Sequence, residues 1–480
     1  MGYVSLTIFL LLFCWILFRL KERFGLSAKT IFVGFGIKLL FSVIFYLIYA
    51  HHYGEGRLSG DAANFYNDSK IIAEWGAKNP KDYLGLMLGV GAEDPGLMAN
   101  ELSETQIWDY GETEDAFNDN RFVIRIHSLI HFVSFNNVFV HLLFMAFLSY
   151  LGLLYLYRTF ESMTARKTWF FFALVGFPSI AFWGSGISKE AVMILGMGLY
   201  FFALMGLLKK RSVGKIVLLL AAVFILLLNK PYVGLILIPV SLVLALGPYR
   251  NWRRTVLYIW SGLILLSLVI FSFMPHHYNL VDRVSAKQKD LINIANGGIF
   301  FITDSSFCAF DYKEVNNFKF ANDKAEVLSP SKGEYKLFGE DEFYPFQIEA
   351  SNRQYDLYLV QAPSNSYVDV PAINGSGIQL LKNTPLAFVN TLFRPIPGDV
   401  LNPLSHLVTS QNIVFLGFLI FVIFNRRKLT GQESYLVYGM ICSALLILLL
   451  IGWTTPILGA IFRYKVAAEL LLITGFFIWL

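Results

Sequence analysis

The stretch EAVMILGMGLYFFALMGLL, residues Glu190–Leu208, is apolar after its first residue and runs directly into the basic residues Lys209, Lys210 and Arg211. About 20 apolar residues are enough for a helix to cross a bilayer. Lys and Arg collect at the cytoplasmic ends of such helices. Similar runs with basic ends recur along the chain, so the sequence predicts an all-α polytopic membrane protein.

The composition of the whole chain agrees with this fold class. Of its 480 residues, 56% are hydrophobic and 15% are charged, with a net charge of +5. A soluble domain carries about 25% charged residues, so the composition excludes a soluble enzyme and a disordered chain. The three cysteines, Cys14, Cys308 and Cys442, indicate neither a disulfide framework nor a metal site.

The apolar runs predict about eleven transmembrane helices, because the shorter runs can borrow flanking residues to reach the membrane thickness. The predicted spans are Tyr3–Leu20, Thr30–Ala50, Asn137–Tyr157, Thr168–Gly184, Glu190–Leu208, Ile216–Leu228, Tyr232–Leu246, Val256–Met274, Ile413–Phe424, Tyr435–Trp453 and Val466–Leu480.

The basic clusters all fall on one side when they are counted along these spans. They are Arg19–Lys29, Arg158–Lys167, Lys209–Lys215, Arg250–Arg254 and Arg426–Lys428. The first cluster follows the first apolar run instead of preceding it, which favours a retained helix over a signal peptide. We therefore expect a multi-pass protein of the bacterial inner membrane with an extracytoplasmic N-terminus.

This orientation divides the chain into five segments. They are two N-terminal spans (1–50), an extracytoplasmic loop with interfacial amphipathic helices (51–136), a transmembrane block of about six helices (137–274), a second extracytoplasmic loop (275–412) and three C-terminal spans (413–480). In the second loop we expect a small β element that includes Gln354–Val360 and a re-entrant or interfacial helix within Asn383–Asp399.

Asp61 is the predicted catalytic residue. It follows Gly60 shortly after the second span and opens a helix whose apolar stripe contains Phe65, Ile72 and Trp75. We expect that stripe to lie on the membrane surface, which would hold the carboxylate where a lipid headgroup meets water. Asp61 would then act as a general base. The alternative is that Asp61 is only the N-cap of this helix.

Cations at the outer ends of the predicted spans could hold an anionic group. Lys189 follows the hairpin Gly176–Ser188, Arg394 lies in a proline-bounded turn, and Arg463 and Lys465 precede the last span. The guanidinium group of Arg can donate two parallel N–H hydrogen bonds to phosphate oxygens, and the ammonium group of Lys supplies a positive charge. These four residues are the predicted phosphate ligands, with Lys230 a further outer cation. Glu469 is the expected partner of Lys465. Interfacial anchoring and snorkelling to lipid are the alternatives.

Other groups give weaker signals. His127, His131 and His141 suggest a metal site, but no zincin-like carboxylate follows them, and an interfacial histidine face is favoured. Asp109 and the acids of 112–119 are interpreted as solvated loop residues. The chain has no P-loop, dinucleotide fingerprint or Gly-x-Ser-x-Gly elbow. We therefore predict no metal, no cofactor and no nucleic-acid partner.

The layout resembles the GT-C superfamily of membrane glycosyltransferases. The resemblance lies in the Ser59-Gly60-Asp61 segment, the hairpin from Phe177 to Glu190 and the late Arg463-Tyr464 pair. The last two features are also similar to those of bacterial O-antigen polymerases. One departure is that the acidic loop follows the second span here, whereas in GT-C enzymes it follows the first.

The resemblance implies inverting transfer of a sugar from a polyprenyl-phosphate donor to a glycan, lipid or protein acceptor. Asp61 would be the base, and Lys189, Arg394, Arg463 and Lys465 would hold the donor phosphate. One alternative is an O-antigen or exopolysaccharide polymerase that uses polyprenyl-diphosphate glycans. The other is a non-enzymatic transporter or flippase, although the ionisable residues collect at the ends of the predicted spans, with Glu469 in the last span as the exception.

The predicted topology can be tested with single cysteines at Ser212 and Ser329, in a background without the three native cysteines. The positive-inside rule places Ser212 in the cytoplasm and Ser329 outside. A membrane-impermeant thiol reagent added to intact cells should therefore label only the cysteine at position 329. Labelling at position 212 in sealed cells would contradict the orientation.

Overall fold

The structure is a computed structural model that describes residues 1–92, 94–108, 118–246, 262, 279–303, 305–321, 324–337, 344–396, 399 and 403–480. The chain divides into two compact units, which are described in turn. The first consists of Met1–Ile264, Phe415–Ile447 and Lys465–Leu480, and the second of Leu265–Val414 and Leu448–Tyr464.

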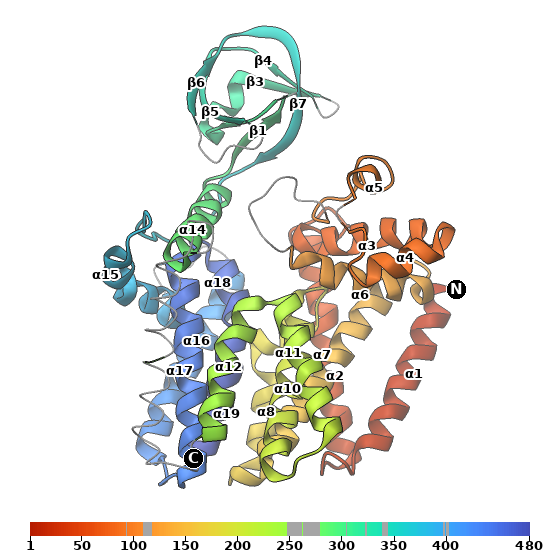
Figure 1. Cartoon of the computed structure of the whole chain (residues 1–480), viewed down its shortest axis with the longest axis vertical. Coiled ribbons are helices and arrows are strands. Elements are labelled where there is room, and N and C mark those ends of the chain that lie inside the picture. The colour runs from red at the N-terminus through yellow and green to blue at the C-terminus, as the bar shows by residue number, and fades with distance from the viewer. Residues whose placement is uncertain are drawn as a thin grey trace. The chain divides into compact units, whose positions relative to one another are not determined.

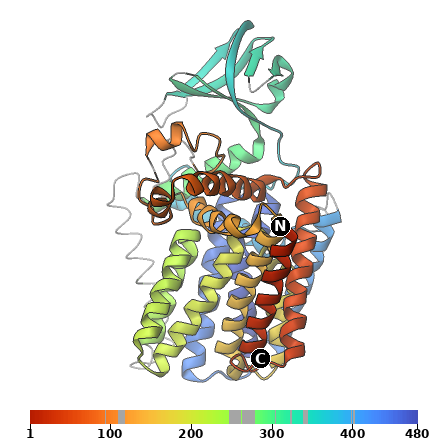
Figure 2. The same cartoon turned by 90° about the vertical axis from the view of Figure 1, so that its right-hand side faces the viewer.

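The first unit is built mainly from long apolar helices that run side by side (Figures 1 and 2). Among the described residues, six helical segments are long and apolar enough to cross a membrane. They lie in α1 (Gly2–Leu20), α2 (Ala28–Leu47, continued by the π-helical turn Ile48–His52), α7 (Val138–Phe160), α10 (Lys189–Lys209), α16 (Pro403–Asn425) and α17 (Gly431–Thr454). The start of α16 and the end of α17 are assigned to the second unit.

Shorter apolar helices complete this unit. They are α8 (Lys167–Gly176), α11 (Val213–Asn229), α12 (Pro231–Leu246) and α19 (Val466–Trp479). These elements confirm that the chain is a mainly helical protein embedded in a membrane. The predicted span Val256–Met274 and the basic cluster Arg250–Arg254 lie outside the described residues.

Close packing of α7 against α10 depends on facing glycines. A Cβ added at Gly198 would lie 2.0 Å from the carbonyl oxygen of Gly152, and one added at Gly152 would lie 2.4 Å from that of Ile194. Small residues allow membrane helices to approach this closely, which increases their van der Waals contact. The packing fixes α10, the helix that carries Lys189 and Glu190 in its first turn.

The second unit contains the sheet. Its strands are β1 (Gly298–Ile302), β2 (Ser306–Phe310), β3 (Phe318–Ala321), β4 (Lys324–Val327), β5 (Ser331–Leu337), β6 (Tyr344–Ile348) and β7 (Ser351–Gln361). They form one antiparallel sheet in the order β3-β4-β7-β1-β2-β5-β6. The predicted strand Gln354–Val360 lies within β7. The sheet is larger than predicted, since its first strand begins at Gly298. Ile299 and Phe301 of that strand contribute to the buried face of the sheet.

The second unit also contains the helices α14 (Leu280–Asn296), α15 (Gly377–Phe388, continued by the π-helical turn Val389–Phe393) and α18 (Leu458–Tyr464). One buried polar side chain, Gln288, joins α14 to two other segments. Gln288 of α14 is 2% exposed. Its amide nitrogen donates to the carbonyls of Pro371 and Trp453, and its oxygen accepts from the N–H of Ile373. Gln288 therefore ties α14 to the end of α17 and to the segment before α15.

A layer of short helices lies across one end of the long helices of the first unit (Figures 1 and 2). It comprises α3 (Gly60–Lys78), α4 (Pro80–Met87), α5 (Pro95–Ala99) and α6 (Asn120–Ser134). The predicted stripe of Phe65, Ile72 and Trp75 on α3 is buried. It packs into a protein core with Val123 and Ile124 of α6, and not on a membrane surface as expected.

Asp68 fastens a loop to this layer. The side chain is fully buried, and its carboxylate oxygens accept hydrogen bonds from the backbone N–H groups of Gln106, Ile107 and Trp108 at 2.9, 2.8 and 2.9 Å. Burial raises the pKa of Asp68, and the three hydrogen bonds act in the opposite direction. Asp68 is therefore a structural carboxylate, although it lies only seven residues after Asp61.

We expect Asp68→Ala to destabilise the first unit by about 3 kcal/mol, because three backbone N–H groups, two of them on buried residues, lose a charged acceptor. Asp68→Asn should be intermediate, since one amide oxygen remains. Asp82→Asn, at an exposed position in the first turn of α4, is the matched control and should leave stability unchanged. Unfolding in detergent can measure all three variants. An unfolding midpoint of Asp68→Ala equal to that of the control would contradict the structural role.

Candidate functional site

Asp61 lies in the first turn of α3 and is exposed. The N-cap of this helix is Ser59, whose hydroxyl donates to the carbonyl oxygen of Tyr49 at 2.7 Å. Gly60 follows with a φ of +57°, a left-handed backbone that glycine adopts without strain. The interpretation of Asp61 as the N-cap is therefore wrong, because Ser59 occupies that position. The carboxylate is presented at the surface of the unit, directly after a tight turn.

The helix predicted at Thr168–Gly184 is broken in two. α8 ends at Gly176, and α9 (Pro178–Trp183) starts at the proline, which has no N–H to continue the hydrogen-bond ladder. A turn through Gly184–Ser188 then leads to α10. This hairpin brings Lys189 and Glu190 to the N-terminus of a packed helix.

Lys189 and Glu190 each pair with a residue far away in the sequence. The Lys189 Nζ lies 2.5 Å from Asp119 Oδ1, and the Glu190 Oε1 lies 2.6 Å from Lys230 Nζ. We call these four residues the four-charge cluster. Asp119 is the last residue before α6 and Lys230 joins α11 to α12. The cluster therefore joins four helices of the first unit.

The two pairs differ in exposure. The side chains of Glu190 and Lys230 are 0% and 4% exposed, whereas those of Lys189 and Asp119 are 11% and 36% exposed. The interpretation of Asp119 as a solvated loop acid is wrong, because the side chain is paired with Lys189. Asp109 and residues 112–117 lie outside the described residues.

Asn229 supports the cluster from α11. It is fully buried, and its amide nitrogen donates to the carbonyl oxygen of Lys189 at 2.7 Å. This bond fixes the orientation of the amide. Its Oδ1 atom has no hydrogen-bond partner among the described residues. A buried acceptor in this state can receive a hydroxyl or a water at the N-terminus of α10.

A second polar centre surrounds α9. Lys38, in the middle of α2, is fully buried, and its ammonium donates to the carbonyl oxygens of Ile180 and Ala181, each at 3.3 Å. No carboxylate pairs with Lys38 in the described part of the chain. Sequence analysis missed this residue, although a single lysine inside an apolar run was a visible signal.

The predicted pairing of Lys465 with Glu469 is confirmed. Their charged atoms lie 3.4 Å apart, and both side chains are almost fully buried. Ser179 at the start of α9 also donates its hydroxyl to Glu469. Lys465 is thus held in a buried ion pair of its own, whereas Lys189 is paired with Asp119.

The two predicted arginines belong to the second unit. Arg394 is half-buried, and its Nε lies 3.5 Å from Asp399 Oδ2. Arg463 lies near the end of α18 and is also half-buried. That the arginines and lysines hold one common ligand stays a prediction.

The three histidines form a buried cluster between α3, α6 and α7. The Nδ1 atoms of His127 and His141 lie 3.0 Å apart, and His131 Nε2 lies 3.1 Å from the carbonyl oxygen of Tyr66. All three rings are buried, so the interpretation as an interfacial face is wrong. No group of three or more metal-ligating side chains is found in the described ranges. The cluster joins the helix that carries Asp61 to the membrane helices.

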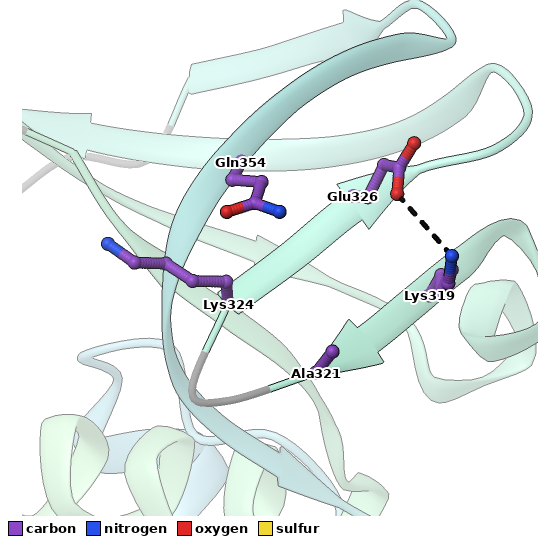
Figure 3. Close-up of a pocket in the computed structure, with 5 residues that line it drawn as sticks. All are labelled: Lys319, Ala321, Lys324, Glu326 and Gln354. Atoms are coloured by element: carbon purple, nitrogen blue, oxygen red, sulfur yellow. Dashed lines mark ion pairs between the residues drawn. The ribbon is translucent and has the colours of Figure 1, made fainter.

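A shallow hollow lies on the sheet of the second unit (Figure 3). Lys319 and Glu326 line it and form an ion pair at 4.0 Å. Lys324 at its edge pairs with Asp356. These are partly exposed surface pairs on neighbouring strands, and such pairs contribute little to binding or stability. The hollow does not provide a buried binding site.

Comparison with known proteins gives no relative for this site. No protein-family model, no curated protein and no solved structure matches the chain.

The histidine cluster predicts a loss of stability in acid. Burial lowers the pKa of His127 to about 3 and also lowers the pKa of His131. His127 is therefore neutral in the folded protein, whereas in the unfolded chain it gains a proton below about pH 6.5. The lowered pKa of His131 acts in the same direction. The stabilisation from neutral His127 is complete above that pH and falls below it, by up to about 1.4 kcal/mol per pH unit.

Thermal unfolding in detergent between pH 7.5 and 5 can measure this slope. His127→Gln should flatten it, whereas His52→Gln, at an exposed position of the same unit, should not. Equal slopes for the parent protein and His127→Gln would contradict the prediction.

Proposed function

We propose that the chain is an integral membrane glycosyltransferase that moves a sugar from a polyprenyl-phosphate donor to a glycan, lipid or protein acceptor at the extracytoplasmic surface. The observation that carries this proposal is the exposed carboxylate of Asp61, held by Ser59 and Gly60 in the first turn of α3. It lies shortly after the membrane helix formed by α2 and its π-helical turn.

The topology that we propose for the protein follows the positive-inside rule. It has about eleven spans, an extracytoplasmic N-terminus and a location in the bacterial inner membrane. Both long polar segments then lie outside, with Asp61 in the first of them.

In the proposed reaction, the hydroxyl oxygen of the acceptor attacks the anomeric carbon of the donor sugar while Asp61 takes the proton of that hydroxyl. The bond between that carbon and the donor phosphate breaks, and the polyprenyl phosphate leaves with the bonding electron pair. Lys189 lies beside the leaving phosphate and stabilises the charge that develops on it. Arg394, Arg463 and Lys465 are the further cations proposed for this role.

A polymerase that uses a polyprenyl-diphosphate glycan is the nearest variant of this reaction. The same carboxylate and cations would serve, but the leaving group would be a diphosphate. The released lipid therefore distinguishes the two enzymes.

A transporter or flippase is the second candidate function, and Lys38 favours it. Transporters place ionisable residues and broken helices inside the membrane. Lys38 is fully buried in α2 and donates to carbonyls of the broken α8–α9 segment. A transporter would move a glycan lipid across a vesicle membrane without needing the Asp61 carboxylate.

Asp61→Asn tests the proposal. Asn keeps the size of the side chain but cannot accept the proton, so transfer should fall by about 10²–10⁴-fold. The assay presents a panel of polyprenyl-phosphate sugars to the protein in lipid nanodiscs and measures the polyprenyl phosphate that is released. Isolated membranes are added as the source of acceptor, so the natural acceptor need not be known.

Asp82→Asn is the matched control, because Asp82 is also an exposed acid in the first turn of a surface helix. It should retain the parental rate. A folded Asp61→Asn protein that releases polyprenyl phosphate as fast as Asp82→Asn would exclude Asp61 as the base. Transport of a glycan lipid by both variants, with no sugar released from any donor, would favour the transporter.

A further inference from the structure

The four-charge cluster consists of an inner pair and an outer pair with different surroundings. The side chains of Glu190 and Lys230 are buried, whereas Asp119 has about a third of its side chain exposed while it is paired with Lys189. Breaking a sealed pair leaves an uncompensated charge away from water, which is strongly unfavourable. A partly exposed pair exchanges partners at much lower cost, because water solvates the carboxylate that leaves.

We infer that Asp119 occupies an anion site in the resting protein and that the phosphate of a lipid-linked ligand displaces it from Lys189. This inference rests on the proposed function for the identity of the ligand. Beyond the proposed function, it identifies Asp119 as the residue that competes with the ligand, and it identifies the residues that hold Lys189 in position. No bond is made or broken in this step, since one anion replaces another at the same ammonium group.

The inner pair keeps Lys189 in position while its partner changes. Glu190 follows Lys189 directly and is anchored by Lys230, and Asn229 holds the backbone carbonyl of Lys189. The backbone of the first turn of α10 is therefore fixed from α11 and from the connection to α12. When Asp119 leaves, the backbone that carries Lys189 therefore stays in place, and the ligand meets a lysine whose attachment point is already fixed.

Phosphate suits this position for two reasons. The Ser188 hydroxyl, at the N-cap of α10, donates to the carbonyl oxygen of Trp183 at 2.7 Å and does not cap the first turn. The N-terminus of this 21-residue helix therefore favours an anion beside the lysine. In addition, the buried Oδ1 of Asn229 offers an acceptor for a hydroxyl, either of a protonated phosphate or of an attached sugar.

Binding to the full chain in nanodiscs tests the inference. The probes are short-chain polyprenyl phosphate without a sugar and, separately, inorganic phosphate. Asp119→Asn removes the competing charge but keeps the shape of the side chain, so polyprenyl phosphate should bind about tenfold tighter. Lys189→Gln should lose at least as much affinity, and Lys189→Arg should recover part of it. Asp82→Asn, at an exposed position of the same unit, should bind as the parent does.

Weaker or unchanged binding in Asp119→Asn, in a protein with the parental unfolding midpoint, would overturn the inference, because Asp119 would then orient Lys189 instead of competing for it. Tighter binding of both probes identifies the phosphate group as the ligand, and tighter binding of the lipid alone identifies the headgroup at the membrane surface. Both outcomes support the site. The readout is binding without transfer, so tighter binding together with the absence of any sugar transfer would leave this site standing and refute the proposed glycosyltransferase.

Discussion

Backbone polar groups inside a bilayer need protein partners, because no water is available to bind them. The same constraint applies to buried backbone in the hairpin between α8 and α10, since the end of α9 and the turn after it have carbonyls that no regular helix continues to bind. Lys38 supplies donors to Ile180 and Ala181, and the hydroxyls of Ser149 and Ser42 donate to Gly184 and Ser185. Residues of α2 and α7 thereby bind the last carbonyls of α9 and those of the turn that follows it.

The charged residues at the end of this hairpin depend on the same arrangement. Lys189 and Glu190 occupy the first turn of α10, and α10 is fixed by its glycine contacts with α7. Because the backbone is fixed, the two side chains meet Asp119 and Lys230, which lie far from them in the sequence. Buried charges are tolerated when they are paired in good geometry, and in this unit Lys465 and Glu469 follow the same rule.

The layer of α3 and α6 carries the carboxylate that we propose as the general base. Its apolar residues pack against protein, and Asp68 and the histidines join it to the loop after α5 and to the membrane helices. Asp61 lies at the exposed end of α3, so its carboxylate stays accessible while the helix beneath it is immobilised. An exposed acid on a rigid support is what a general base in the proposed reaction would require.

The membrane class, the positions of most helices and the presence of Asp61 at the start of a helix could be predicted from the sequence. Length, apolarity and local signals such as Gly60 depend only on neighbouring residues, which is why they can be read without a structure. The pairing of Lys465 with Glu469 was predictable for the same reason, since the two residues lie one helical turn apart.

Tertiary structure alone decided the partners of Lys189 and Glu190, the carbonyl partners of Lys38 and the structural role of Asp68. Each depends on contacts between segments that lie tens of residues apart or more, such as Asp68 with Gln106–Trp108 and Lys38 with α9. A charged residue looks the same in a sequence whether its partner is water or a distant side chain. Only the packing of helices determines which of the two it meets, and hence which carboxylate remains exposed.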